Sequence, residues 1–99
     1  MAYVAVSEVA VPSEGACGLE QAFRDRVRLV ERADGFLGIE VLRDRRRRGR
    51  YLMITHWTSK EAFRAYMQSA DHAVSHARIP GGPLGPRAAG FSDYDTVDV

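Results

Sequence analysis

Apolar residues recur along this chain with two spacings, and each spacing predicts one type of element. An alternation of apolar and polar positions, typical of strands, occupies four segments: 3–11, 36–43, 51–57 and, more weakly, 91–97. A spacing of three to four residues, typical of amphipathic helices, occupies three further segments: 19–32, 59–68 and 71–78. The pattern therefore predicts four strands and two main helices, with a short additional helix after the second one.

Turn and cap signals set the expected boundaries. Asp34-Gly35 is expected to end the first helix, and Thr58 is expected to cap the second, with Glu61 reaching back in a capping box. The segment 79–89 holds three prolines and three glycines and is predicted to be a loop. The resulting order, β-α-β-β-α-β, predicts a single α+β, ferredoxin-like domain over residues 1–99, with helices on one face of an antiparallel sheet.

Three of the predicted strands carry apolar residues on both faces. In the second strand, Leu37, Ile39 and Val41 are expected on one face, with Phe36 and Leu42 on the other. An antiparallel sheet with one solvated face is normally polar on that side. We therefore expect the second face to be buried, either against another copy in a sheet-to-sheet dimer or under a long loop or the C-terminal segment.

Composition narrows the class of protein. The chain has 99 residues, 45% of them hydrophobic and 27% charged, as in ordinary soluble domains. It has no apolar run of membrane-spanning length, no basic leader and a single cysteine, Cys17, so a cytoplasmic protein without membrane association is expected.

Basic charge is concentrated in one run. Net charge is +1, yet residues 43–50 hold six arginines and one aspartate, or +5. Because no aromatic residue lies within this run, it does not resemble a nucleic-acid surface. Two interpretations remain open: a solvated hairpin tip that discourages aggregation, or a patch that attracts an anionic ligand or partner.

The chemistry-bearing residues gather between positions 51 and 76, which contain all three histidines and the only tryptophan. His72 and His76 have the four-residue spacing that can chelate a metal on a helix, but no third ligand is evident, so no dedicated metal site is expected. His56 is expected to be a hydrogen-bonded core residue. His76 can serve as a base, as an iron ligand or as a surface residue.

Three segments together resemble one family. These are Asp34–Gly38, then the run Tyr51–Phe63 (YLMITHWTSKEAF), then Ser69–His76 (SADHAVSH). They are similar to antibiotic biosynthesis monooxygenase domains, and most of all to the actinobacterial Isd-type heme-degrading branch. The resemblance implies a dimeric α+β barrel with one pocket per subunit between helices and sheet.

The resemblance also implies site residues. In heme-degrading members, an asparagine on the first strand, a tryptophan on the second helix and an axial histidine form the site. This chain has Ser7 and Tyr66 at the first two positions, and His76 maps best to the third, one residue further along. The residues expected to act in catalysis are Ser7, Tyr66 and His76, and those expected to line the pocket, where they can also be core, are Phe23, Trp57, Phe63 and Met67.

Three functional hypotheses follow. The first is a homodimeric, cofactor-independent monooxygenase that inserts oxygen from O₂ into a bulky, planar, anthrone-like aromatic, with Ser7, Tyr66 and His76 polarising a phenolate. The second is a heme-binding and heme-degrading monooxygenase with His76 on the iron. The third is a non-catalytic dimer that captures a hydrophobic metabolite.

Overall fold

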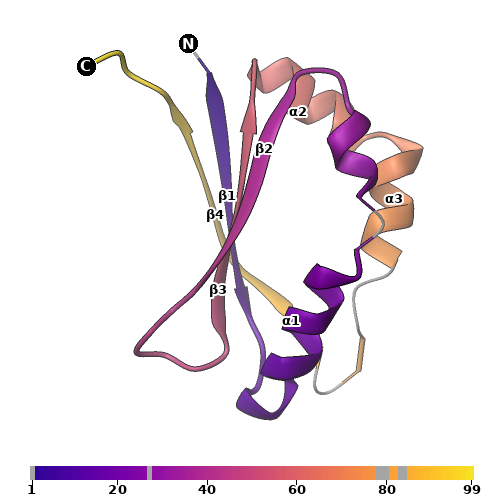
Figure 1. Ribbon diagram of the computed structural model, residues 1–99, viewed down its shortest axis with the longest axis vertical. Coiled ribbons are helices and arrows are strands. Elements are labelled where there is room, and N and C mark those ends of the chain that lie inside the picture. The colour runs from indigo at the N-terminus through magenta and orange to yellow at the C-terminus, as the bar shows by residue number, and fades with distance from the viewer. Residues whose placement is uncertain (1, 27, 78–80, 83–84) are drawn as a thin grey trace.

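The computed structural model describes residues 2–26, 28–77, 81–82 and 85–99, and it shows one antiparallel sheet with helices along one side (Figure 1). The elements follow one another as β1 (Tyr3–Ala10), α1 (Ala16–Arg24), β2 (Phe36–Arg43), β3 (Arg50–Trp57), α2 (Lys60–Met67), α3 (Ala70–Ala77) and β4 (Arg87–Asp95). Short 3₁₀ helices occupy Ser13–Gly15 and Leu29–Arg32. The strand order is β2-β3-β1-β4, so the predicted α+β, ferredoxin-like fold is confirmed.

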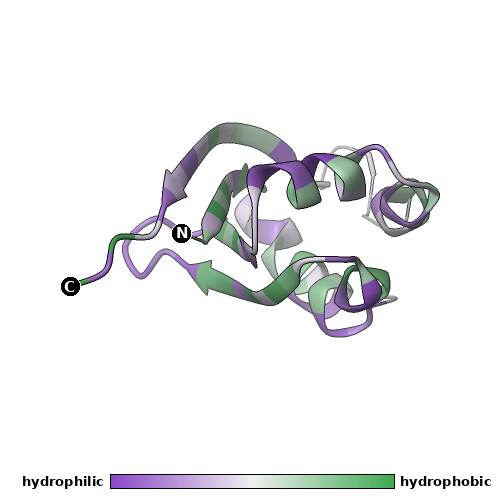
Figure 2. Ribbon diagram, turned by 90° about the horizontal axis from the view of Figure 1, so that it is seen from above, coloured by the Kyte–Doolittle hydropathy of each residue, from purple (hydrophilic) through white to green (hydrophobic). Residues whose placement is uncertain are grey.

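The side of the sheet that faces the helices forms the core. Tyr3 on β1 pairs with Trp57 on β3, and Ile39 on β2 pairs with Thr55, so these side chains share that side. Trp57 is only 1% exposed and Thr55 only 8%. Seen from above, the sheet and the helices form two layers, and both contain hydrophobic residues (Figure 2).

None of the described helices covers the opposite side of the sheet, and we call that side the open face. Alternation along the paired strands places these residues there: Val4, Val6, Glu8, Glu40, Leu42, Leu52, Ile54, His56 and Tyr94. The prediction that His56 is a core residue is wrong, because its strand position turns it to the open face, where its Nε2 lies 3.6 Å from Glu40 Oε1. The open face is therefore largely apolar, with one acid–histidine pair on it.

The core is divided into two clusters at opposite ends of the sheet. One contains Tyr3, Ala5, Val30 and Trp57, with Phe36, Phe63 and Tyr66 packed against them. The other contains Val11, Ala16, Leu19 and Tyr51, with Val9 and Phe23 packed against them. The first cluster anchors α2 to the sheet, and the second anchors α1.

The predicted helix over residues 19–32 is wrong as a single element. The structure ends α1 at Arg24, turns through a left-handed residue at Arg28 (φ 62°) and resumes as the 3₁₀ helix Leu29–Arg32. The break has a packing cause, since Leu19 fills one core cluster and Val30 the other. No helix in the described part of the chain is long and apolar enough to cross a bilayer.

Other boundaries differ by smaller amounts. The last strand begins earlier than the predicted residue 91, at Arg87, which shortens the predicted loop at its C-terminal side. Residues 79, 80, 83 and 84 of that loop, and Arg78 of the predicted short helix, lie outside the described residues.

Local chemistry at the start of β2 and α2 also differs from the prediction. A bulge between Phe36 and Gly38 places Phe36 on the helix side, against Trp57, and leaves Leu37 57% exposed. The cap of α2 is Ser59, whose hydroxyl accepts from the Ala62 N–H at 3.1 Å, so the predicted Thr58 cap is wrong.

Candidate functional site

Three aromatic rings pack on Trp57 at the end of the sheet that α2 covers. The ring centroids of Phe36, Phe63 and Tyr66 lie 5.4, 5.8 and 5.6 Å from that of Trp57. The indole N–H of Trp57 donates to Thr55 Oγ1 at 2.8 Å, so this buried donor is satisfied. Aromatic pairs in such tilted and edge-on arrangements each contribute roughly 0.5–1.5 kcal/mol beyond their burial. Phe63 and Tyr66 are therefore held as a rigid wall.

Two histidines on α3 continue this aromatic row. The His72 ring lies edge-on to Tyr66 with centroids 5.4 Å apart, and the His76 ring lies 5.9 Å beyond it. His72 is half-buried and His76 is exposed. Burial, and then the neighbouring His76, lower the pKa of His72 below its usual 6.5, while the backbone of Met67 acts in the opposite direction. His72 is therefore kept neutral at physiological pH, with a lone pair available.

Two contacts fix α3 against the rest of the molecule. The Ser69 hydroxyl accepts from the His72 N–H at 3.2 Å and donates to the Tyr66 carbonyl at 2.6 Å, which joins α2 to the start of α3. Arg32 donates two parallel hydrogen bonds to Asp71, at 2.9 and 3.0 Å. This bidentate pair ties α3 to the 3₁₀ helix Leu29–Arg32 and lowers the pKa of Asp71.

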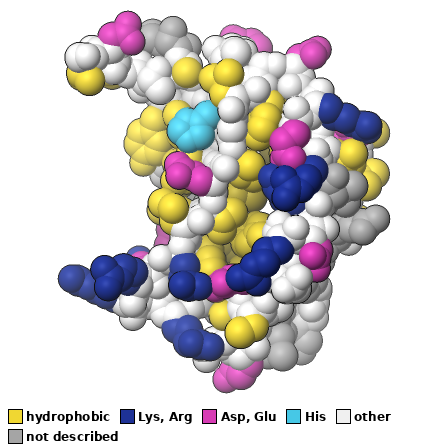
Figure 3. Space-filling model, viewed as in Figure 1, with side chains coloured by type: hydrophobic (Ala, Val, Ile, Leu, Met, Phe, Trp, Pro, Cys, Tyr) yellow, Lys and Arg dark blue, Asp and Glu magenta, His cyan; other side chains and the backbone are white. Residues whose placement is uncertain are grey.

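Ser7 lies on the sheet, on the side that faces the helices. It pairs with Met53 on β3 and with Phe91 on β4, and Phe91 stacks on Phe63 with centroids 6.1 Å apart. Among the described residues, the Ser7 hydroxyl has no hydrogen-bond partner. The space-filling view shows a hollow between sheet and helices in which hydrophobic side chains are visible (Figure 3). This region thus combines flat apolar walls with isolated polar groups, as small-molecule sites do.

The structure places the predicted site residues unequally. Trp57, Phe63 and Tyr66 are in direct contact, and His76 joins them through His72. Trp57 is buried behind the other rings, so a ligand would meet the rings packed on it.

Two of the predicted pocket residues lie outside the row of rings formed by Trp57, Tyr66, His72 and His76. Phe23 packs in the second core cluster, with Leu19 and Tyr51, at the other end of the sheet. Met67 is 43% exposed and belongs to neither cluster. Their role as pocket residues stays a prediction.

Two residues of this region were not among the site residues predicted from the sequence. His72 occupies the place between Tyr66 and His76, and its spacing of four residues from His76 was the available signal. Phe91 stacks on Phe63 from β4, and only the strand register shows this.

His72 and His76 suit a metal ion whose other coordination positions are already filled by a cofactor. In the described ranges, no three side chains of histidine, cysteine, aspartate or glutamate lie together. His72 and His76 alone offer two imidazoles, which is fewer than a dedicated zinc site requires. A porphyrin iron already has four nitrogen ligands and needs only an axial one, commonly histidine. The residues present therefore fit a heme better than a free metal ion.

Comparison with known proteins gives one consistent family. A profile described as "Antibiotic biosynthesis monooxygenase" matches residues 2–78. Proteins named heme oxygenase (mycobilin-producing), from two strains of Mycobacterium tuberculosis, are 37% identical over 99 residues, covering all of this chain and 93% of theirs.

Solved structures agree with that result. The heme-degrader MhuD from Mycobacterium tuberculosis, solved with two hemes in its active site, superposes with a TM-score of 0.79 at 33% identity, covering 98% of each chain. SnoaB, a cofactor-independent oxygenase from Streptomyces nogalater, superposes with a TM-score of 0.76 over 99% of this chain and 95% of its own. At 17% identity, SnoaB shares the fold alone. With its profile match, its fold and its near full-length relatives in agreement, this chain belongs to the antibiotic biosynthesis monooxygenase family and is an oxidoreductase of the monooxygenase type.

Proposed function

We propose that this protein binds heme between α3 and the sheet and oxygenates it. The observation that carries the proposal is the row Tyr66–His72–His76, which sets imidazoles beside a rigid aromatic wall. The near full-length identity of 37% with mycobilin-producing heme oxygenases supports the same substrate. Bound heme would supply an iron that reacts with O₂ and with electrons from an external donor.

The protein's own residues have separate tasks in this proposal. His76 would hold the iron, because its ring is the exposed end of the row. His72 packs between Tyr66 and His76 and limits the rotation of both rings. Phe63 and Phe91, whose rings stack on each other with centroids 6.1 Å apart, would offer a flat apolar surface to one face of the substrate.

Hemin titration tests the proposal. We expect the protein to bind hemin with a shifted and sharpened Soret band, His76→Ala to abolish the shift, and His72→Ala to weaken binding while keeping the band position. His56→Ala is the matched control, since His56 lies on the open face away from the helices. An unaltered free-hemin spectrum with the wild-type protein, or an equal loss in His56→Ala, would contradict the proposal.

A second candidate is cofactor-independent oxygenation of an anthrone-like aromatic. The observation that favours it is the hydroxyl pair: Ser7 on the sheet and Tyr66 on α2 stand where the heme-degrading pattern has asparagine and tryptophan. Hydroxyls can donate to a phenolate, which then reduces O₂ directly. This candidate predicts that colourless protein consumes O₂ with dithranol, an anthrone, in the presence of a chelator. Loss of that activity on chelation would count against it.

We also propose that the protein is a homodimer formed through the open face. Val4, Val6, Leu52 and Ile54 form a half-buried apolar strip there, and Leu42 is 45% exposed beside it. Burying an apolar sheet face against an equivalent one is the usual way to form such a dimer. Sedimentation velocity checks this: a dimer mass at micromolar concentration is expected, and Ile54→Lys should give a folded monomer. A wild-type monomer at the same concentration would refute the dimer.

A further inference from the structure

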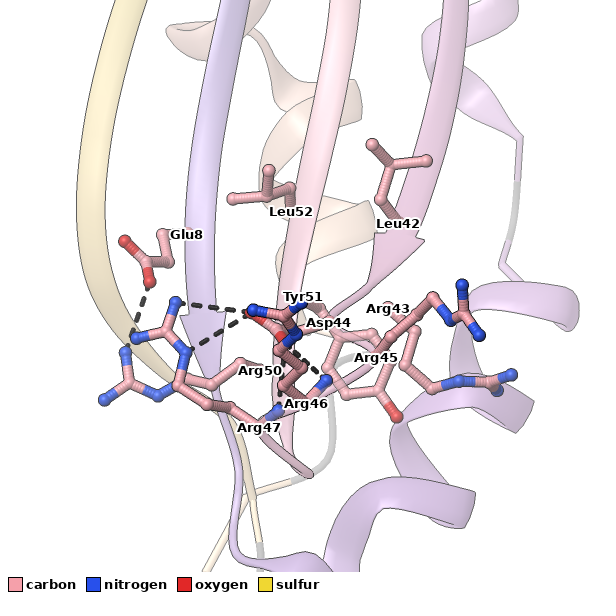
Figure 4. A pocket seen from close by; sticks show the side chains of 10 residues that line it. All are labelled: Glu8, Leu42, Arg43, Asp44, Arg45, Arg46, Arg47, Arg50, Tyr51 and Leu52. Carbon is pink, nitrogen blue, oxygen red and sulfur yellow. Dashed lines mark hydrogen bonds and ion pairs between the residues drawn. The ribbon is translucent and has the colours of Figure 1, made fainter.

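The hairpin that joins β2 to β3 forms a pocket at one end of the open face. Its volume is about 390 Å³, in the lower part of the range of roughly 300–1,000 Å³ that is usual for small-molecule sites. Leu42 and Leu52 project from the strands on one side of it, and arginines of the hairpin lie below them (Figure 4). The pocket therefore has an apolar wall and a cationic wall.

Two anchors hold the hairpin in one conformation. At its start, Asp44 Oδ1 accepts from the backbone N–H groups of Arg46 and Arg47, at 2.8 and 2.9 Å. At its end, Gly49 has a left-handed backbone (φ 85°), and its carbonyl accepts from the Val11 N–H at 2.8 Å. A Cβ at position 49 would collide with the Val11 carbonyl oxygen, so only glycine permits this close approach. The arginine side chains thus extend from a fixed backbone, and ordering that backbone adds little to the cost of binding a ligand.

Positive charge in the pocket exceeds what the chain itself neutralises. Three arginines have acidic partners: Arg43 with Glu20 at 2.9 Å, Arg47 with Asp44 at 3.3 Å and Arg50 with Glu8 at 3.2 Å. Arg45 and Arg46 also line the pocket, and neither side chain forms an ion pair with any residue that the structure describes. Two guanidinium groups are therefore available to a ligand with two negative charges.

These two guanidinium groups fit a phosphate monoester better than other common anions. A phosphate monoester carries close to two negative charges at pH 7 and has three acceptor oxygens, so it can accept from both groups at once. A carboxylate has a single charge and would leave one arginine unpaired. Leu42 and Leu52 offer aliphatic surface beside the charged groups. Tyr51, the only aromatic residue among the described lining residues, is 3% exposed and cannot stack on a base, which argues against a nucleotide.

We propose that the pocket binds an aliphatic phosphate monoester, with its phosphate at Arg45 and Arg46 and its aliphatic group against Leu42 and Leu52. All of these residues come from one chain. The ligand would lie on the opposite side of the sheet from the aromatic row, so the proposal does not depend on heme binding. Leu52 also belongs to the apolar strip of the proposed homodimer, and the ligand would therefore lie at the end of that interface.

Calorimetric titration with hexyl phosphate at low salt tests the proposal, and one ligand is expected to bind per chain. Hexyl sulfate has the same aliphatic group with a single negative charge, and inorganic phosphate has no aliphatic group. Each is expected to bind about tenfold more weakly or worse, because each lacks one of the two features that the pocket recognises. Since the second pKa of a phosphate monoester is about 6, affinity for hexyl phosphate should also fall as pH is lowered through that value.

Three variants locate the site. Arg45→Gln combined with Arg46→Gln is expected to weaken hexyl phosphate binding about tenfold or more, since it removes both free guanidinium groups. Leu42→Asn should lower the affinity for hexyl phosphate to that for inorganic phosphate, and the fold should tolerate it because Leu42 is 45% exposed. Arg64→Gln is the matched control, because Arg64 is exposed on α2 and should leave binding unchanged. Circular dichroism verifies the fold of every variant.

Phosphatidylcholine vesicles with and without phosphatidic acid distinguish two sources of the phosphate group. Co-sedimentation that requires phosphatidic acid, Arg45 and Arg46 assigns the site to a lipid head group, whereas hexyl phosphate binding without co-sedimentation assigns it to a soluble compound. The proposal is overturned if hexyl phosphate does not bind the wild-type protein, if the double arginine variant binds it as tightly, or if hexyl sulfate binds equally well. An equal loss in Arg64→Gln would also overturn it, because attraction would then follow overall charge. Hemin binding reports on the proposed function separately.

Discussion

The hydrogen bond between Tyr51 and Glu20 offers the sharpest test of how α1 is held to the sheet. Tyr51 is 3% exposed, and its hydroxyl donates to Glu20 Oε2 at 2.6 Å. Arg43 also donates to both carboxylate oxygens, at 2.9 and 3.0 Å. Burial, followed by the bond to Glu20, raises the pKa of Tyr51 to about 12. The same bond, followed by the bond from Arg43, lowers the pKa of Glu20 from 4.5.

The magnitude follows from the type of bond. Tyr51→Phe keeps the ring in place and removes one donor to a carboxylate, and such bonds contribute roughly 1.5–3 kcal/mol. Because Arg43 still satisfies Glu20 in the variant, the lower half of that range applies, about 1.5–2 kcal/mol. For a domain of this size, that loss lowers Tm by about 6–16 °C. Urea unfolding monitored by circular dichroism measures the free energy of unfolding directly.

A double-mutant cycle isolates the pair. Tyr51→Phe, Glu20→Gln and their combination are expected to show a coupling energy of about 1–2 kcal/mol at pH 7. Tyr3→Phe is the control, since Tyr3 also donates to a carboxylate but belongs to the other core cluster, so its effect should add to that of Glu20→Gln within about 0.5 kcal/mol.

The cycle also has a predicted pH dependence. A carboxyl group whose pKa is lowered by folding stabilises the folded state at pH values above its unfolded pKa, which for Glu20 is near 4.5. This stabilisation is lost as pH falls through the pKa of the folded state. The coupling should therefore shrink as pH falls below 4.5 and Glu20 becomes protonated at its lowered pKa. A coupling near zero at pH 7, or one that is the same at pH 7 and pH 3, would refute the reasoning.

Three further predictions test the anchors of the site. Trp57→Ala should cost about 3–5 kcal/mol in urea unfolding, because it empties the centre of an aromatic cluster, and a loss below 1 kcal/mol would contradict that packing. Ser59→Ala should cost about 1 kcal/mol by removing the cap of α2, with Thr58→Ala nearly neutral; the reverse order would show that Thr58 is the cap. Since the pKa of His72 is lowered, stability should fall as pH drops below 6.5, where the unfolded imidazole takes up a proton first. His72→Gln should flatten that part of the pH–stability curve, and an unchanged curve would show that another group titrates there.

The regular part of the fold could be predicted from local pattern. Apolar alternation located the segments of β1, β2 and β3 to within a residue, because a strand with a buried face must alternate. The end of α1 at Arg24 could not be predicted in this way, since the helical spacing continues to residue 32. The break depends on two separate core clusters, and such tertiary requirements leave no mark in a local window.

In the candidate site, too, local spacing could be predicted from the sequence, whereas tertiary contacts could not. The four-residue spacing of His72 and His76 correctly placed both rings on one helix face. The choice between them could not be made from the sequence, because only the contact with Tyr66 shows that His72 is the half-buried ring. Phe91 was missed because its contact with Phe63 depends on the register of β4 against β1. Register across a sheet is a long-range property that a single strand does not specify.

Oxygen-dependent turnover of bound hemin is the decisive measurement for heme oxygenation by this protein. Hemin-loaded protein is mixed with an electron donor such as ascorbate in air, with catalase present to remove free peroxide, and the Soret absorbance is followed while products are analysed by mass spectrometry. We expect loss of the Soret band with formation of an oxygenated, ring-opened tetrapyrrole in wild type and in His56→Ala, and no such loss in His76→Ala. A Soret band that persists in wild type, or that is lost equally in His76→Ala, would contradict heme oxygenation at this site.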